Sequence, residues 1–323
     1  MVRSRSLMSA SIDHLDEVDI QMHSSTECTW STHTAKTEYS TKDSISQCSL
    51  PSTITTQNEP LKYSKEIEEE GVRRILNALT IDEMNAMSDP NLPLRHFRAD
   101  KGNIEKAIKR TKYAIKWRQD FGVDKILRSV ENPTTEEEHE IRKVLLHECS
   151  TAKIYVRNHD REGRATLYFY LVRENTYNHK HNMMHLVFQI EKGIACTAKN
   201  GFEKVNIIMD FTDWKLKDAS SIETTKETIH ILQDCYVERL NRVFMTNAPV
   251  IFRSFWNIAK PFIDPTTKRK IVFCSGKSGL KEVEAQFDLN KLEKCAGGVR
   301  DLRPFDVNEY FSLPLNQTFD EME

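Results

Sequence analysis

The spacing of apolar residues changes character along the 323-residue chain. Before about residue 150 the apolar positions recur every three or four residues, which predicts helices. The clearest stretch runs from 104 to 121, with Gly122 placed to end it. Its remaining faces are strongly basic, and charges in this arrangement usually form a solvated face. A second helix is expected at Glu136–His147.

Beyond residue 150, short β-branched and aromatic runs alternate with long helical stretches. The runs predict strands at Lys153–Val156, Ala165–Val172, Val205–Phe211, Arg242–Met245 and Ile271–Cys274. The intervening helices are expected at Asn182–Lys199, Ile222–Tyr236 and Val250–Phe262. Strands that alternate with helices form βαβ units with parallel strands. The sequence therefore predicts an α/β fold in which an all-helical N-terminal lobe precedes a mostly parallel sheet.

The first sixty residues have a different composition from the rest. They contain 21 Ser and Thr residues, only 18 apolar residues, and 4 basic against 8 acidic residues. Such a segment cannot bury enough apolar surface to offset the entropy of ordering it, so we expect residues 1–60 to be disordered. The density of hydroxyl groups suits a phosphorylated regulatory region, and an inert leader explains it equally well.

Composition excludes several function classes. The net charge of −2 argues against nucleic-acid binding through bulk positive charge. Only 10 residues are glycine and no G-x-G-x-x-G occurs, which argues against a dinucleotide cofactor. The sequence Cys274–Ser278 resembles a phosphate-binding loop, but Ile271 stands where that loop needs its first glycine. No cofactor is therefore expected.

The seven cysteines form no C-x-x-C pair, so we expect reduced thiols and no structural zinc site. His179, His181 and His185 have a spacing compatible with a metal, but no carboxylate or cysteine lies near them in sequence, and no metal is predicted. No catalytic signature is present either, since the chain lacks a G-x-S-x-G motif. The absence of these motifs predicts a protein that is not an enzyme.

No apolar run approaches the ~20 residues of a membrane-spanning helix, and the N-terminus lacks the apolar core of a secretory signal. We therefore expect a cytoplasmic protein. The helix predicted at 250–262 is nevertheless apolar around most of its circumference, with Arg253, Asn257 and Lys260 forming one narrow polar stripe. A helix of this kind is normally buried on two sides or lies against lipid.

Several blocks of the sequence, in order, resemble the CRAL-TRIO lipid-binding domain family, typified by the fungal phosphatidylinositol/phosphatidylcholine transfer proteins. These blocks are Leu94–Ala99 with Trp117–Arg118, Asp160–Arg164, Met209–Asp210, Val237–Arg239 with Asn247–Pro249, and Cys295–Gly298. The resemblance covers most of residues 65 to 312. Together with the composition of the first sixty residues, it divides the chain into a disordered region (1–60), the helical lobe (61–150), the lipid-binding domain (151–312) and a C-terminal tail (313–323).

The resemblance implies an apolar cavity that holds one lipid, floored by the sheet and closed by the helix at 250–262 acting as a gate. The residues it assigns to the acyl cavity and gate are Tyr168, Tyr170, Ile207, Met209, Ile251, Phe252, Phe255, Trp256 and Phe262. Enclosing the acyl chains would remove much of the cost of exposing them to water, at ~0.8 kcal/mol per CH2 group.

The resemblance also assigns residues to the lipid headgroup. The family positions that support an inositol phosphate correspond to Lys101, Glu238, Arg239, Thr267 and Lys270. Asp100 stands where the family has an arginine, and a carboxylate there would repel a phosphate unless a neighbouring base pairs with it. The two hydroxyl positions associated with phosphatidylcholine hold Val205 and Ile207. Phosphatidylinositol is therefore favoured over phosphatidylcholine.

The resemblance implies a monomeric protein that binds a phospholipid, touches membranes transiently and transfers the lipid between them. Two alternatives stay open. One is a carrier of a different hydrophobic ligand, such as a sterol, a tocopherol or a retinoid. The other is a lipid-gated adaptor that presents its ligand to the enzymes of phosphoinositide signalling.

Overall fold

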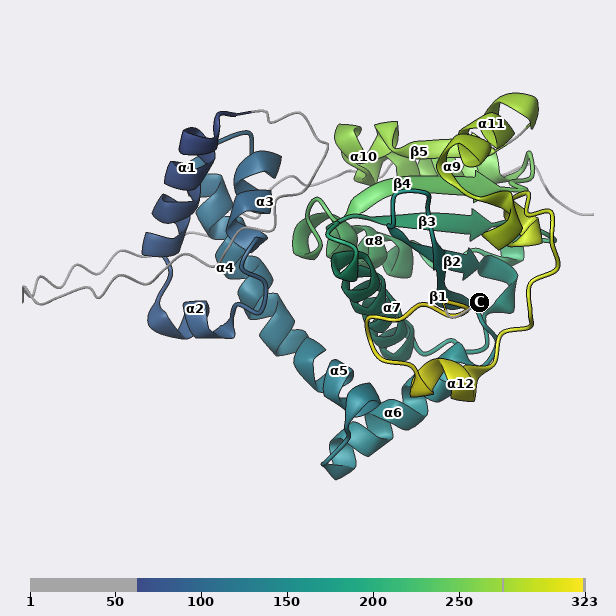
Figure 1. Ribbon diagram of the computed structural model, residues 1–323, viewed down its shortest axis with the longest axis horizontal. Helices are drawn as coiled ribbons and strands as arrows, with labels where there is room; N and C mark the ends of the chain where they lie inside the picture. The colour runs from purple at the N-terminus through teal and green to yellow at the C-terminus, as the bar shows by residue number, and fades with distance from the viewer. Residues whose placement is uncertain (1–62, 275, 322–323) are drawn as a thin grey trace, which may run out of the picture. The chain divides into compact units, whose positions relative to one another are not determined.

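The computed structural model describes residues 63–274 and 276–321 (Figure 1). The region predicted to be disordered, 1–60, lies outside these residues. Within the described part, the helices before the sheet are α1 (Lys65–Asn77), α2 (Ile81–Ala86), α3 (Leu92–Ala99), α4 (Ile104–Phe121), α5 (Val123–Glu131) and α6 (Glu136–Cys149). The prediction of helices N-terminal to a sheet is confirmed.

Local capping explains where the predicted helices begin and end. The side chain of Asn103 accepts a hydrogen bond from the backbone N–H of Lys106 at the start of α4. Gly122 ends α4 with φ of 77°, a left-handed conformation that suits glycine. At the start of α6, Thr135 and Glu138 cap each other's backbone N–H groups. These short-range signals are legible in the sequence.

The sheet has the strand order β1-β2-β3-β4-β5. Its strands are β1 (Ile154–His159), β2 (Ala165–Tyr170), β3 (Val205–Asp210), β4 (Leu240–Thr246) and β5 (Ile271–Cys274). Only β1 runs antiparallel to its neighbour, and the other pairs are parallel, which confirms the mostly parallel sheet. β1 extends three residues beyond the predicted strand. The prediction missed these residues because the second half of β1 is polar, and polar residues such as Arg157 carry no apolar strand signal.

The later helices are α7 (His179–Lys199), α8 (Ile222–His230), α9 (Phe252–Ala259), α10 (Pro265–Arg269), α11 (Gly276–Gln286) and α12 (Val307–Ser312). The single helix predicted at 222–236 is instead α8 followed by a π-helical turn, η3 (Ile231–Cys235). The helix predicted at 250–262 is α9 followed by a 3-10 turn, η4 (Lys260–Phe262), in which Pro261 stands at one of the first positions.

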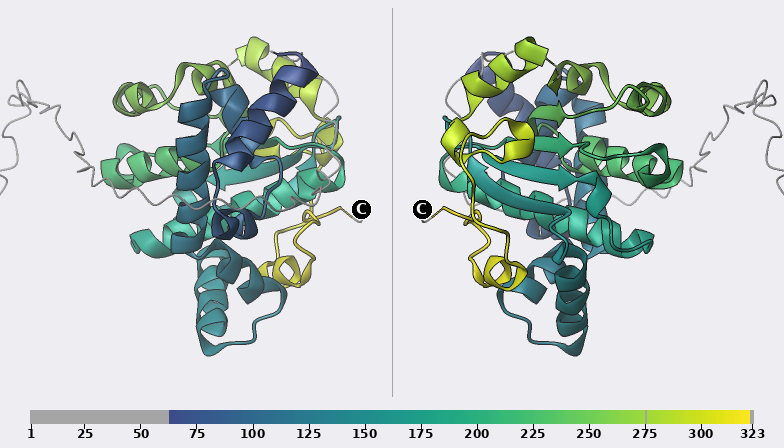
Figure 2. Two further views of the ribbon diagram at one scale, coloured as in Figure 1. Left: turned by 90° about the vertical axis from the view of Figure 1, so that its left-hand side faces the viewer. Right: turned by 90° about the vertical axis from the view of Figure 1, so that its right-hand side faces the viewer.

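The two faces of the sheet have different coverings. α7 approaches one face so closely that a Cβ added at Gly193 would lie 2.5 Å from Leu167 Cδ1. Leu167 pairs in register with Ile207, so Ile207 shares this face. In Figure 2, α7, α8 and α9 lie on this side of the sheet. On the opposite face, Phe244 of β4 packs against Phe287, just after α11, with ring centroids 5.4 Å apart.

The segment after α12 packs against the sheet and α7. Phe319 is fully buried and its backbone N–H donates to the carbonyl oxygen of Val156 in β1. The Arg157 side chain, 2% exposed, pairs with Glu293 and with Asp320. Residues 313–321, predicted to be a tail, therefore contribute buried side chains and ion pairs to the domain.

Candidate functional site

The inner face of α9 is anchored by a cluster of aromatic rings. Phe252 is 4% exposed, and its ring centroid lies 4.3 Å from that of Phe211 and 5.7 Å from that of Trp214. Phe255 and Trp256 are half-buried, and Trp256 packs edge-on against Phe273 of β5 at 5.5 Å. These ring contacts hold the inner face of α9 to the rest of the domain.

The outer face of α9 and its flanks expose large apolar side chains. Val250 is 79% exposed, Ile251 49%, Ile258 52% and Phe262 41%. These four residues are called the outer apolar row below. Single exposed apolar residues are ordinary, but a group of four on one short segment marks an interaction surface.

The π-helical turn η3 holds the C-terminal end of the segment that contains α9 and η4. The Gln233 side-chain Nε2 donates to the carbonyl oxygen of Phe262 at 3.0 Å, and its Oε1 accepts from the backbone N–H of Asp264 at 2.6 Å. Lys226 of α8 adds a cation–π contact, with its Nζ 4.8 Å from the centre of the Phe262 ring. Gln233 thus clamps both sides of the turn through which the predicted gate would hinge.

We expect Gln233→Ala to loosen the region from η4 to α10. Removing two hydrogen bonds of roughly 0.5–1.5 kcal/mol each should speed local amide exchange about tenfold at residues 260–264. Hydrogen–deuterium exchange with mass spectrometry measures this, and Gln119→Ala, at an exposed position of α4, is the matched control. Equal protection of residues 260–264 in both variants would show that Gln233 does not hold the hinge.

Two of the predicted headgroup residues lie together. Lys270 Nζ is 3.8 Å from the Glu238 carboxylate and donates a hydrogen bond to the carbonyl oxygen of Leu240 at 2.7 Å. The Glu238 carboxylate also lies 3.3 Å from Lys204 Nζ. Thr267 is on α10, one turn before Lys270, and its backbone N–H donates to Asp264 at 2.9 Å. The structure thus brings Glu238 and Lys270 into contact, with Thr267 on the adjoining helix.

Arg239 and Lys101 lie apart from this group. The Arg239 guanidinium turns toward the helical lobe, where it pairs with Asp89 and donates to the carbonyl oxygen of Glu203 at 3.1 Å. Burial and the neighbouring Arg95 guanidinium lower the pKa of Arg239. The Lys101 side chain is exposed and makes no hydrogen bond or ion pair within residues 63–274 and 276–321.

Asp100 is neutralised by a base of the next helix. Its carboxylate lies 3.5 Å from the Arg110 guanidinium, which is also 3.9 Å from Asp234 of η3. Burial raises the pKa of Asp100, although Arg110 acts in the opposite direction. Arg110 is therefore the neighbouring base that would keep the Asp100 carboxylate from repelling a phosphate.

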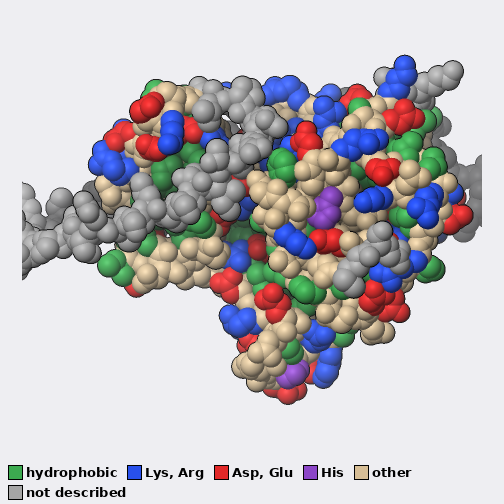
Figure 3. Space-filling model, in the orientation of Figure 1, with side chains coloured by type: hydrophobic (Ala, Val, Ile, Leu, Met, Phe, Trp, Pro, Cys, Tyr) green, Lys and Arg blue, Asp and Glu red, His purple; other side chains and the backbone are tan. Residues whose placement is uncertain are grey.

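Other basic residues of α4 are also paired. Lys112 lies 3.1 Å from Glu83, Lys116 lies 2.9 Å from Asp120, and Arg118 lies 2.6 Å from Glu191 of α7. Figure 3 shows basic and acidic side chains interspersed over the face of the molecule that it presents. The basic helix is therefore part of a network of ion pairs, and some of them join it to other elements.

The predicted cavity residues are divided between the two faces of the sheet. Met209 pairs in register with Met245, and Met245 with Phe273, so these three share the face on which Trp256 packs. Ile207 lies on that face as well. A cavity beneath α9 would be lined by Met209 and Ile207.

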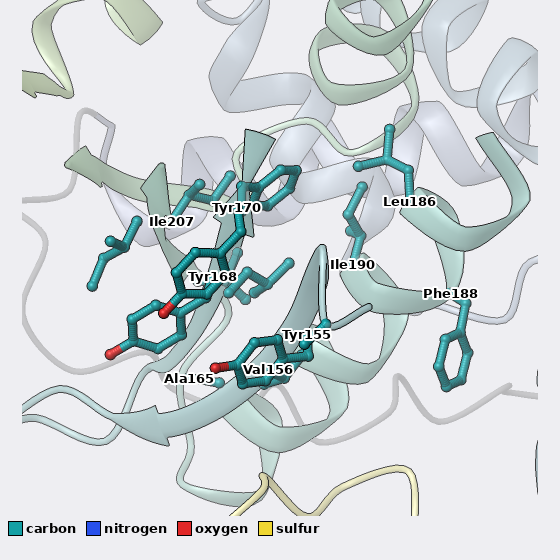
Figure 4. Close-up of a cluster of buried hydrophobic side chains, with 14 of the residues drawn as sticks. Tyr155, Val156, Ala165, Tyr168, Tyr170, Leu186, Phe188, Ile190 and Ile207 are labelled. Carbon is teal, nitrogen blue, oxygen red and sulfur yellow. The ribbon is translucent and has the colours of Figure 1, made fainter. Parts of the chain in front are cut away.

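Tyr168 and Tyr170 point to the opposite face, because Tyr168 pairs with Ile208 and side chains alternate along a strand. There they stack with Tyr155, as Figure 4 shows, with ring centroids 5.9–6.3 Å apart. Tyr155 donates to Glu293 at 2.6 Å, and Tyr170 lies 3.5 Å from the sulfur of Cys295. Neither Tyr168 nor Tyr170 would therefore face a cavity beneath α9.

The histidines singled out from the sequence have separate surroundings. His185 is fully buried and lies 3.0 Å from Gln189, while burial lowers its pKa to about 3. His179 reaches α8, where it lies 3.0 Å from Thr224 Oγ1. Among the described residues no group of His, Cys, Asp and Glu could hold a metal ion.

No helix in the described part of the chain is long and apolar enough to cross a bilayer. A helical lobe, a mostly parallel sheet and a helix with an outer apolar row define the architecture of this α/β domain. The family model for the CRAL/TRIO domain matches residues 150–298. The resemblance to the CRAL-TRIO family is therefore confirmed over residues 150–298.

Several curated proteins are similar to this chain. A CRAL-TRIO domain-containing protein of Schizosaccharomyces pombe is 32% identical over 56% of this chain and 16% of its own length. The phosphatidylinositol transfer protein PDR17 of Saccharomyces cerevisiae is 29% identical over 56% of this chain and 51% of its own length. The SEC14 cytosolic factor of Kluyveromyces lactis is 29% identical over 74% of this chain and 80% of its own length. This chain thus spans about half or less of the length of the first two relatives.

A solved structure shows the same fold. The crystal structure of Sfh5 superposes with a TM-score of 0.53 over 78% of this chain and 98% of that one, at 15% identity. The agreement at so low an identity concerns the arrangement of the helices and the sheet. It therefore supports the α/β fold with a preceding helical lobe.

Sequence reasoning missed Gln233, Phe211 and Trp214. Phe211 was expected as the last residue of the strand that became β3, and Trp214 lies in the loop after it, so no pattern in the sequence indicated their contacts with α9. Gln233 lies within a stretch that looks like an ordinary helix, and the π-helical turn that aims its side chain at the hinge has no pattern in the sequence.

Proposed function

We propose that this protein encloses one lipid of the phosphatidylinositol class beneath α9 and carries it between membranes. The observation that carries the proposal is the pairing of an inner ring cluster with the outer apolar row on the same short helix. In the closed protein the row faces water, which is unfavourable. At a bilayer the row would enter the interface, so the membrane itself would draw the helix away from the sheet.

The charged groups near β4 and α10 support the choice of headgroup. Lys270 and Lys204 both lie within ion-pair distance of the Glu238 carboxylate, so two basic side chains gather at the start of β4, where a phosphate would be attracted. Thr267 offers a hydroxyl on the adjoining helix turn. PDR17, one of the relatives, is named a phosphatidylinositol transfer protein. We place the activity in the cytoplasm, with a monomer that associates transiently with membrane surfaces.

The test is a vesicle-to-vesicle transfer assay with the variant Lys270→Ala/Thr267→Ala. Charge-assisted hydrogen bonds are worth roughly 1.5–3 kcal/mol, so we expect phosphatidylinositol transfer to fall about tenfold or more. Folding should persist by circular dichroism, because both side chains are partly exposed. Arg269→Ala, an exposed base on the same helix, is the matched control and should transfer normally.

Three outcomes separate the alternatives. Unchanged transfer by the double variant would overturn the headgroup assignment while leaving lipid transfer in place. Lipid that co-purifies with the wild-type protein but is not transferred would indicate the adaptor. Native mass spectrometry of the bound lipid identifies the ligand directly, and a sterol or another neutral lipid would contradict the phosphatidylinositol proposal.

A further inference from the structure

A cavity of about 260 Å³ lies between the helical lobe and the sheet lobe. Its walls come from the turn between α2 and α3, from α4, from α7 and from the end of η3. This volume corresponds to about nine waters at ~30 Å³ each, or to a molecule of roughly a dozen non-hydrogen atoms. None of the residues assigned to the gate or the acyl cavity lines it.

One side of the cavity is apolar and includes two aromatic residues. Trp117 of α4 and Tyr236 after η3 contact each other edge to face, with ring centroids 5.8 Å apart. Ile115 and Ile194 extend this side along α4 and α7. Such a surface accepts a flat ring or a short hydrocarbon body.

The other side of the cavity carries three guanidinium groups, those of Arg95, Arg118 and Arg239, against the carboxylates of Asp89 and Glu191. Arg118 is paired with Glu191 at 2.6 Å. Arg95 and Arg239 both bind the single carboxylate of Asp89. The lining thus holds three guanidinium groups and two carboxylates, and the carboxylates of Asp124 and Glu203 pair with Arg118 and Arg95 from outside the lining.

Arg95 has an unmet hydrogen-bonding group. Its side chain is 4% exposed, its second carboxylate neighbour, Glu203, is 3.7 Å away, and its Nε has no hydrogen-bond partner among the described residues. A buried donor without a partner is unfavourable, because it has lost its hydrogen bonds to water without gaining others. Burial alone would raise the pKa of Asp89, yet Arg95 and Arg239 together lower it to about 2, which reflects the crowding of positive charge here.

We propose that this interlobe cavity is a second ligand site, separate from the lipid site, and that it takes a small amphipathic anion with a carboxylate or phosphate head and an aromatic or short aliphatic body. The head accepts hydrogen bonds from the Arg95 guanidinium, whose Nε has no other partner among the described residues. The body lies against Trp117 and Tyr236. Because Tyr236 follows Gln233 by three residues and precedes Glu238 by two, an occupant touches the segment that links the gate hinge to the headgroup residues.

The experiment uses the full-length chain labelled with 5-fluorotryptophan. Its four tryptophans, Trp30, Trp117, Trp214 and Trp256, give separate 19F resonances that Trp→Phe variants assign. The probes are 4-phenylbutyrate, its phosphate analogue 3-phenylpropyl phosphate, and the neutral 4-phenylbutanol. We expect the acids to shift the Trp117 resonance saturably and to bind roughly tenfold more tightly than the alcohol.

The two acids distinguish the sources of the anion, since tighter binding of the phosphate indicates a phosphate ester and tighter binding of the carboxylate indicates an organic acid. Ala114→Phe fills part of the cavity and should abolish the shift. Lys116→Ala, an exposed base on the same helix, should leave it unchanged. Three results overturn the proposal: no shift of Trp117, equal binding of acid and alcohol, or shifts confined to Trp214 and Trp256, which would place the probe beneath α9.

Discussion

Replacing two residues of the outer apolar row, Ile251→Asp and Ile258→Asp, should nearly abolish vesicle binding and lipid transfer. Each isoleucine that enters an apolar phase contributes roughly 1.5–3 kcal/mol, so the loss of both corresponds to a fall of about a hundredfold or more. Both side chains are about half exposed in the closed protein, at 49% and 52%, and the double variant should remain folded. Co-sedimentation with vesicles measures the binding, and the transfer assay measures the consequence.

The matched control for this variant is Asn257→Asp. It adds a negative charge at an exposed polar position of the same helix without removing an apolar side chain. Normal vesicle binding by Asn257→Asp, beside loss of binding by the double variant, would assign the effect to the apolar row. Normal transfer by the double variant would contradict the proposal that α9 enters the membrane.

Replacing Arg157 by methionine should destabilise the domain by about 3–5 kcal/mol. The Arg157 guanidinium donates to Glu293 at 2.5 Å and to the carbonyl oxygen of Arg303 at 2.7 Å, and it pairs with Asp320. Methionine keeps much of the volume but leaves the carboxylates facing each other with less compensating charge in a buried setting. Removing one member of a buried ion pair typically costs this much.

Urea unfolding followed by circular dichroism measures the change in the free energy of unfolding. Lys116→Met is the control, because Lys116 is 75% exposed in its ion pair with Asp120 and should contribute less than about 1 kcal/mol. A loss below about 1 kcal/mol for Arg157→Met would show that segment 313–321 is held by its apolar contacts, such as those of Phe319, and not by its charges.

Much of the fold could be predicted because its signals are local. Gly122 and Thr135 mark helix ends through contacts within a few residues. The apolar run of β3 identifies a strand covered on both faces. Where prediction failed, a distant partner decided the outcome: β1 continues through Arg157 because Glu293 and Asp320, more than a hundred residues away, pair with that buried charge.

The candidate site could be predicted only in part for the same reason. Glu238 and Lys270 come into contact because β4 and β5 are neighbouring parallel strands, a relation that follows from the βαβ pattern. Arg239, the residue next to Glu238, turns instead toward Asp89 of the helical lobe. The sequence shows a basic residue at that position, and only the packing of the two lobes determines which carboxylate it meets.

The sequence by itself therefore determined the order of the five strands and of the longer helices between them, and the apolar character of the helix after β4, since periodicity and capping act over a few residues. The tertiary structure alone decided which side of the sheet each side chain faces. Tyr168 lies opposite α9 while Met209 lies beneath it, because strand register is set by long-range pairing and alternates with every residue. It also decided that Val250 and Ile258 face outward while Phe252 is buried, since only the docking of α9 onto Phe211 and Trp214 distinguishes the two sides of so apolar a helix.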